Sequence, residues 1–242
     1  MMISAMSARP ALSTLSPRAA ATPQAETAAE PLDLSTIDTP AKAVLLPCLN
    51  PATQGVVLAG MVLSSMSGSP VTASLQMAFN DLTGDVNYKF NHEDLSQAVT
   101  AQGTIAGLPY SETWSLDQEK KTINMQAQLG ETKVDLTLTP GQKGALVRGK
   151  AGNLPVLQII AMEGNSGEKI TTRGKLGTET FNGDMSIKER EDNGYDLSVT
   201  GKLGNAEISQ QVSLAKQEQG LQMSGEGNLA GTSFSFTGSL GS

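Results

Sequence analysis

Residues suited to acid–base, nucleophilic or metal chemistry are sparse in this 242-residue chain. The one histidine, His92, lies in the segment Asn91-His92-Glu93-Asp94, and the one cysteine is Cys48. A single loop histidine beside acids is more often solvated than a ligand or a general base. The sequence has no Gly-x-Ser-x-Gly elbow, no Walker loop and no paired Cys or His spacing. It therefore predicts no catalytic, cofactor-binding or metal-ligating residue, and a protein that is not an enzyme.

Three polar residues interrupt an otherwise apolar pattern. Glu112, Gln158 and Gln210 stand at alternate positions whose neighbours of the same parity are mostly apolar. Two interpretations are open: the side chains lie at the rim of a sheet, which we favour, or they are polar anchors inside a ligand cavity. Trp114 shares the same face and is expected to belong to the core.

The elements that must position these residues are β-strands. From Val71 to Leu240 apolar and polar residues alternate in about 14 runs, each about 12 residues long including its turn. Such spacing is typical of an antiparallel up-and-down meander. A sheet of this size with one apolar face cannot stay flat and open. We therefore predict an all-β fold that curls into a barrel or trough around one N-terminal hydrophobic helix.

A short glycine-containing pattern recurs within the predicted strands. It is typified by Arg173-Gly174-Lys175-Leu176-Gly177 and Thr200-Gly201-Lys202-Leu203-Gly204. The units begin at Gln102, Gln126, Arg148, Arg173, Thr200 and Glu226. Each unit is interpreted as one hairpin repeat: a strand, a tight turn and a return strand.

The turns set the strand register. Glycine at the first central position, as in Gly204-Asn205, suits a type II′ two-residue turn, which needs a positive φ there. The register then puts Gly201 opposite Ile208, Gly174 opposite Phe181, and Val199 opposite Gln210. Each such glycine is expected to be covered by a bulky cross-strand neighbour while the sheet creases. A valine at position 201 should clash with Ile208 or flatten that crease.

Composition divides the chain into three regions. Residues 1–40 are rich in Ala, Ser, Pro and Thr and contain no glycine, which predicts a flexible tail. Residues 41–70 form a linker and a buried hydrophobic helix at about 50–66, although a strand remains an alternative there. Residues 71–242 form the β-meander. No segment is a convincing signal peptide or membrane-spanning helix, and the sequence leaves the location of the protein open.

Function is less well defined by the sequence than the fold. A net charge of -7 argues against nucleic acid as a partner. Our best hypothesis is a soluble, non-enzymatic carrier of an apolar, lipid-like ligand inside the curled sheet. One alternative is a structural or protein-interaction scaffold of hairpin repeats. A second alternative is an outer-membrane β-barrel. Such a barrel needs a girdle of aromatic residues at each membrane interface, and the nine aromatic residues of this chain are too few for two girdles.

Overall fold

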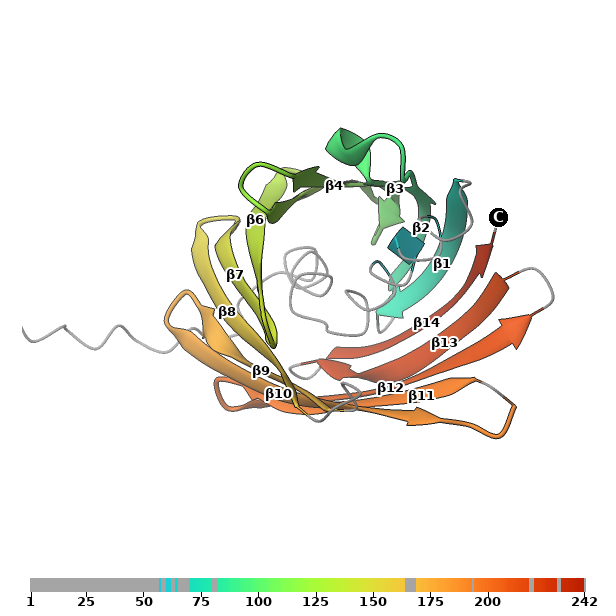
Figure 1. Cartoon of the computed structure of the whole chain (residues 1–242). Helices are drawn as coiled ribbons and strands as arrows, with labels where there is room; N and C mark the ends of the chain where they lie inside the picture. Colours follow the sequence, from blue (N-terminus) through green and yellow to red (C-terminus); the bar gives the residue numbers. More distant parts are fainter. Residues whose placement is uncertain are drawn as a thin grey trace, which may run out of the picture. The chain divides into compact units, whose positions relative to one another are not determined.

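A closed ring of antiparallel strands forms the structure, which is a computed structural model (Figure 1). It describes residues 70–79, 82–163, 169–192, 194–217, 220–229 and 232–241, together with Val57, Gly60, Met61 and Ser64. The tail predicted over residues 1–40 lies outside these residues. Each of fourteen strands pairs with its chain neighbours, and β1 pairs with β14, where Met77 lies opposite Phe236. The expected meander is therefore confirmed, and it closes as a barrel.

The strands are similar in length and connected in chain order. They are β1 (Val71–Phe79), β2 (Leu82–Phe90), β3 (Val99–Ile105), β4 (Leu108–Asp117), β5 (Thr122–Leu129), β6 (Thr132–Gly141), β7 (Gly144–Ala151), β8 (Leu154–Glu163), β9 (Lys169–Leu176), β10 (Glu179–Glu189), β11 (Tyr195–Leu203), β12 (Ala206–Gln217), β13 (Gly220–Leu229) and β14 (Thr232–Gly241). A short 3-10 helix, η1 (Leu95–Gln97), lies between β2 and β3.

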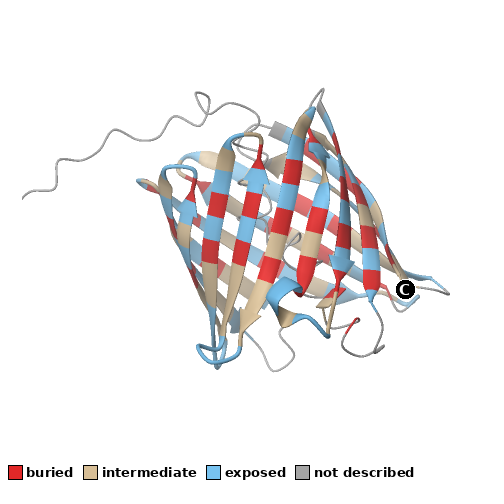
Figure 2. Ribbon diagram, turned by 90° about the horizontal axis from the view of Figure 1, so that it is seen from above, coloured by how far each residue is buried: buried red, intermediate tan, exposed pale blue. Residues whose placement is uncertain are grey.

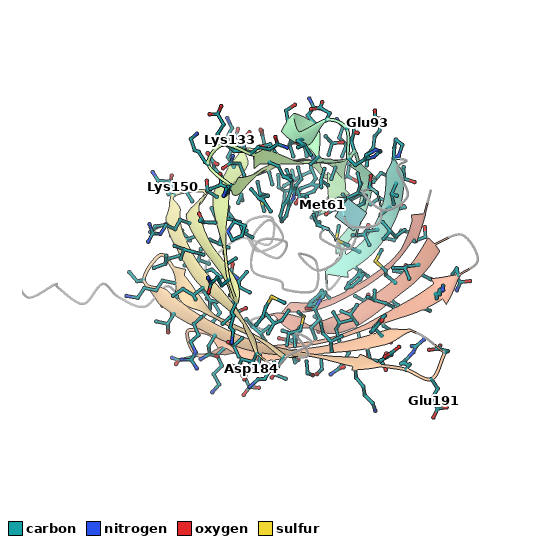
Figure 3. The ribbon with its side chains drawn as sticks, in the orientation of Figure 1. Met61, Glu93, Lys133, Lys150, Asp184 and Glu191 are labelled. Carbon is teal, nitrogen blue, oxygen red and sulfur yellow. The ribbon has the colours of Figure 1, made fainter. Side chains whose placement is uncertain are left out.

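Alternation along each strand separates an apolar interior from a polar exterior (Figure 2). On β2, Val86 and Tyr88 are buried, whereas Asp85 and Asn87 between them are exposed. The buried side chains form one core cluster that draws on every strand. Lys133, Lys150 and Asp184 point away from the ring in Figure 3. Burial of this one-sided apolar surface is the main force that closes the sheet.

The tight turns have the geometry that their glycines predict. Gly130, Gly177 and Gly204 have φ of 55°, 61° and 57°, and the residue after each has a negative φ, as in a type II′ turn. The β3–β4 turn is different, because Ala106 and Gly107 both have positive φ, at 53° and 75°. This is the pattern of a type I′ turn.

The predicted cross-strand partners are confirmed. Gly201 lies opposite Ile208, Val199 opposite Gln210, and Gly174 opposite Phe181. In the β3–β4 hairpin, Val99 lies opposite Trp114, and Trp114 belongs to the core as expected. Because a slip of one residue would turn each strand inside out, this register decides which side chains face the interior.

The glycines inside the strands mark places where neighbouring backbones approach closely. At Gly201 an added Cβ would overlap the carbonyl oxygen of Asn182 on the adjacent strand. Gly103, Gly149, Gly174 and Gly227 show the same relation to a carbonyl of the preceding strand. Bulky neighbours cover only some of them: the Phe181 ring covers Gly174, and the Phe236 ring covers Gly225. The clash expected between a valine at 201 and Ile208 is therefore with the backbone instead.

Part of the predicted helix over residues 50–66 is described. Val57, Gly60, Met61 and Ser64 have helical backbone conformation, and their spacing puts them on one face of a helix. Val57 and Met61 pack with the barrel core. Ser64 Oγ donates a hydrogen bond of 3.4 Å to the carbonyl of Phe90, and Gly60 lies against the Phe90 ring. Met61 lies inside the ring of strands in Figure 3.

A valine at Gly201 tests the close approach of β10 and β11. We expect Gly201→Val to lower the free energy of unfolding by about 3 kcal/mol, because its side chain can be placed only by moving the Asn182 carbonyl. Ser198→Val, on the outer side of the same strand, should cost less than about 1 kcal/mol. Urea unfolding followed by circular dichroism measures both, and equal losses would contradict the assigned faces.

Candidate functional site inside the barrel

A cluster of hydrogen bonds converges on Glu112 of β4. The Tyr110 hydroxyl donates to Oε2 at 2.6 Å, and the Tyr88 hydroxyl donates to the same oxygen at 3.1 Å. The indole Nε1 of Trp114 donates to Oε1. Glu112 is only 2% exposed, and its three donors are buried as well. Both oxygens of this buried carboxyl group thus accept hydrogen bonds from protein side chains.

Strand alternation and two alanines make room for this cluster. Tyr110, Glu112 and Trp114 are alternate residues of β4, so all three point inward. Ala101 of β3 lies opposite Glu112 and, on its other side, opposite Tyr88. Its small side chain lets the Tyr88 hydroxyl reach across β3. Ala127 flanks Glu112 on β5 in the same way.

Burial controls the ionisation of this group. Removal from water raises the pKa of Glu112 above its ordinary value of 4.5, and the three donated hydrogen bonds oppose that rise. No cation among the described residues contributes to this balance. Since its oxygens are already occupied by protein donors, Glu112 is better suited to holding β2 and β4 in place than to anchoring a ligand.

Gln158 and Gln210, the other two inward polar residues, differ from Glu112 because some of their polar atoms have no hydrogen-bond partner among the described residues. Gln158 is fully buried, and neither its Oε1 nor its Nε2 has a partner among the described residues. Gln210 is 3% exposed, and its Nε2 likewise has none there. A buried amide group without a partner costs about 1–3 kcal/mol. These two side chains are therefore the positions at which a ligand could restore the most stability.

A row of inward residues with two glycines at its centre separates the two glutamines. Thr172, Gly183, Gly201 and Ile208 are successive cross-strand partners on β9 to β12, and we call this row the glycine crease. A cavity of about 20 Å³ lies along it, with Phe181, Val199 and Leu203 among its lining residues. This volume is close to the space of one water molecule.

Both glutamines border the crease. Gln158 lies opposite Gly174, which is two residues from Thr172 on the same face of β9. Gln210 is two residues from Ile208 on β12 and lies opposite Val199. The crease and its two glutamines lie on β8 to β12, whereas Phe90, against which Ser64 and Gly60 lie, is on β2.

The favoured interpretation of the three polar residues was wrong. They lie in the middle of β4, β8 and β12 and are buried there, so none is at the rim of the sheet. Sequence reasoning missed Tyr88 and Tyr110 as donors to Glu112. The available signal was the pair of alanines, Ala101 and Ala127, on either side of a long polar side chain.

The remaining chemical groups lie outside this site. His92 is in the loop that follows β2. In the hairpin after β10, Arg190 forms ion pairs with Asp192 at 2.6 Å and Asp196 at 3.4 Å. The described residues include no cluster of three or more His, Cys, Asp or Glu side chains that could hold a metal ion. Within that same part of the chain, no helix is long and apolar enough to cross a membrane.

Stability should depend on pH through Glu112. Because its pKa is raised in the folded state, the folded protein holds this proton where the unfolded chain releases it. The contribution of the Glu112 carboxyl to the free energy of unfolding is therefore fully present below pH 4.5, and it is lost as the pH rises through the pKa of the folded state. The midpoint of urea unfolding should decrease less with rising pH in Glu112→Gln than in the wild type. Glu226→Gln, at an exposed position, should keep the wild-type pH dependence. Identical pH profiles for the wild type and Glu112→Gln would contradict the assignment.

Comparison of the chain with protein-family models, with curated proteins and with solved structures gave no match. We therefore infer function from the chemistry of the barrel interior.

Proposed function

We propose that the protein is a carrier that binds a neutral, lipid-like molecule inside the barrel, beside the glycine crease. The observation that carries this proposal is the pair of buried glutamines, Gln158 and Gln210, whose amide groups have atoms without a hydrogen-bond partner among the described residues. Both point into an interior whose buried residues on the neighbouring strands are mostly apolar, with Thr172 and Glu179 as the buried polar exceptions on β9 and β10. An apolar lining with a few convergent polar groups is typical of small-molecule sites.

The size of the barrel supports the binding of a molecule in its interior. About eight strands already make a barrel that side chains can fill, and this one has fourteen. Val57 and Met61 pack against part of the inner surface. The crease adds only the small cavity of about 20 Å³ beside Gly183. An acyl chain packed against the apolar lining would gain about 25 cal/mol for each Å² of apolar surface that it buries.

The chemistry of the lining favours a neutral ligand. Among the residues of the crease and its border, Thr172, Gln158 and Gln210 are the polar ones, and none carries a charge. Bringing a charged head group to such a wall would cost more free energy than two amides return. An ester, amide or hydroxyl group can accept a hydrogen bond from the glutamine Nε2, and a hydroxyl or amide N–H can also donate to Gln158 Oε1.

The polarity of the outer wall supports an interior site over the alternative of an outer-membrane barrel. The outward residues of β2 include Asp85, Asn87 and Lys89, and those of β10 include Asn182 and Asp184, all exposed. A membrane barrel needs an apolar band on that side. This distribution also supports our expectation of a soluble carrier.

Extraction of the purified full chain tests the proposal directly. Organic solvent followed by mass spectrometry should recover a neutral lipid in a near-equimolar amount. Emptied protein should then enhance the fluorescence of N-phenyl-1-naphthylamine, and the recovered lipid should displace this probe. Absence of both an extractable apolar molecule and a fluorescence response would refute the proposal.

Replacing a glutamine should separate stability from binding. We expect Gln158→Leu to raise the free energy of unfolding of emptied protein by about 1 kcal/mol, because it removes an unpaired buried amide. The same change should weaken binding of the recovered lipid by about fivefold, since one hydrogen bond is lost. Gln126→Leu, at an exposed outward position, should change neither quantity. A destabilised Gln158→Leu variant with unchanged affinity would show that Gln158 belongs to the scaffold alone.

A further inference from the structure

The outer wall over β7, β8 and β9 differs from the rest of the exterior. Leu157 and Ile159 point outward from β8, at 39% and 54% exposed, and they are two of the four large apolar side chains that are exposed among the described residues. Leu146 of β7 lies directly opposite Ile159 and extends the apolar surface. Exposed aliphatic side chains grouped in this way are typical of an interaction surface.

Cationic side chains surround these aliphatic residues in register. Leu157 lies between Arg148 of β7 and Lys175 of β9, and Ile159 has Arg173 of β9 as its other neighbour. Lys150 adds a further cation on β7, and Figure 3 shows it pointing away from the ring. We call this surface, Leu146, Arg148, Lys150, Leu157, Ile159, Arg173 and Lys175, the basic-aliphatic wall.

Cations outnumber acids on the wall, although Asp135 of β6 lies opposite Lys150. The three strands carry five Lys or Arg residues and one acid, Glu163, in a chain whose net charge is -7. Glu163 pairs with Lys169 at 3.8 Å, near the end of the strands. Arg148, Arg173 and Lys175 form no ion pair with any described residue. The wall therefore has charge available for an external anionic partner.

The shape of the wall favours a planar partner over a peptide. Three grooves on the described outer surface, of about 900, 490 and 350 Å³, lie over β1 to β3 and β12 to β14. No residue of the basic-aliphatic wall lines any of them. A wall that lines none of these grooves can place aliphatic tips into a bilayer interface while the flanking cations contact anionic head groups.

We propose that the basic-aliphatic wall docks the barrel onto an anionic phospholipid surface. Leu157 and Ile159 enter the head-group region, and Arg148, Arg173 and Lys175 contact lipid phosphates. The aliphatic part of each Arg or Lys side chain can lie along its apolar neighbour while the charged end reaches outward. This inference does not rest on the proposed interior ligand, since it concerns the opposite face of the sheet.

Vesicle flotation with the purified full chain tests the proposal. The protein should float with vesicles of phosphatidylcholine mixed with phosphatidylglycerol, should float poorly with phosphatidylcholine alone, and should be released by high salt. The double variant Arg173→Gln/Lys175→Gln should bind about 25-fold more weakly, because each cation contributes about fivefold near such a surface. Leu157→Ser/Ile159→Ser should weaken binding by about tenfold or more.

Matched variants on other walls separate this site from general electrostatics. Lys89→Gln/Lys202→Gln removes two exposed cations elsewhere, and Tyr195→Ser removes another exposed apolar side chain. Neither should change flotation. The proposal is overturned if these controls weaken binding as much as the wall variants do, or if no anionic vesicle is bound. It is also overturned if light scattering shows a dimer that the wall variants convert to a monomer, since a second copy would then cover the wall.

Discussion

The close approach of a backbone carbonyl to a strand glycine is the constraint on which the shape of this barrel depends. It recurs at Gly103, Gly149, Gly174, Gly201 and Gly227, each facing a carbonyl of the preceding strand. Any side chain at these positions would push two strands apart. Because the contact is between backbones, a flexible neighbouring side chain cannot relieve it. The sheet can therefore bend sharply at regular places and return to β1 after fourteen strands.

Closure of the barrel separates a solvated exterior from a buried interior, and a polar side chain has a different energetic cost in each. Outside, Ser, Thr, Asn and Lys side chains on alternate positions meet water at little cost. Inside, every polar group needs a partner. Glu112 has Tyr88, Tyr110 and Trp114, whereas Gln158 has none among the described residues. Glu112 therefore has a structural role, whereas Gln158 belongs to the candidate site, although both residues interrupt the apolar pattern in the same way.

The glycine crease relates the architecture to that candidate site. Gly183 and Gly201 stand side by side in this row, and Thr172 and Ile208 continue it on either side. Gly201 permits the close approach of the Asn182 carbonyl, and Gly183 lines the small cavity. Gln158 and Gln210 border the row from β8 and β12. The glycines of the bent sheet thus lie beside the two buried glutamines.

The amino-acid sequence by itself determined the strands, their turns and their register, because period-two alternation and turn glycines act over a few residues. It placed Gly201 opposite Ile208 and Trp114 on the interior face. Tertiary structure alone decided that the sheet closes, since pairing of β1 with β14 joins residues more than 150 positions apart. It also decided which interior polar groups are satisfied, because Tyr88 reaches Glu112 only across Ala101 on the strand between them. Local pattern specifies the face on which a side chain lies, and only three-dimensional packing specifies what that side chain contacts.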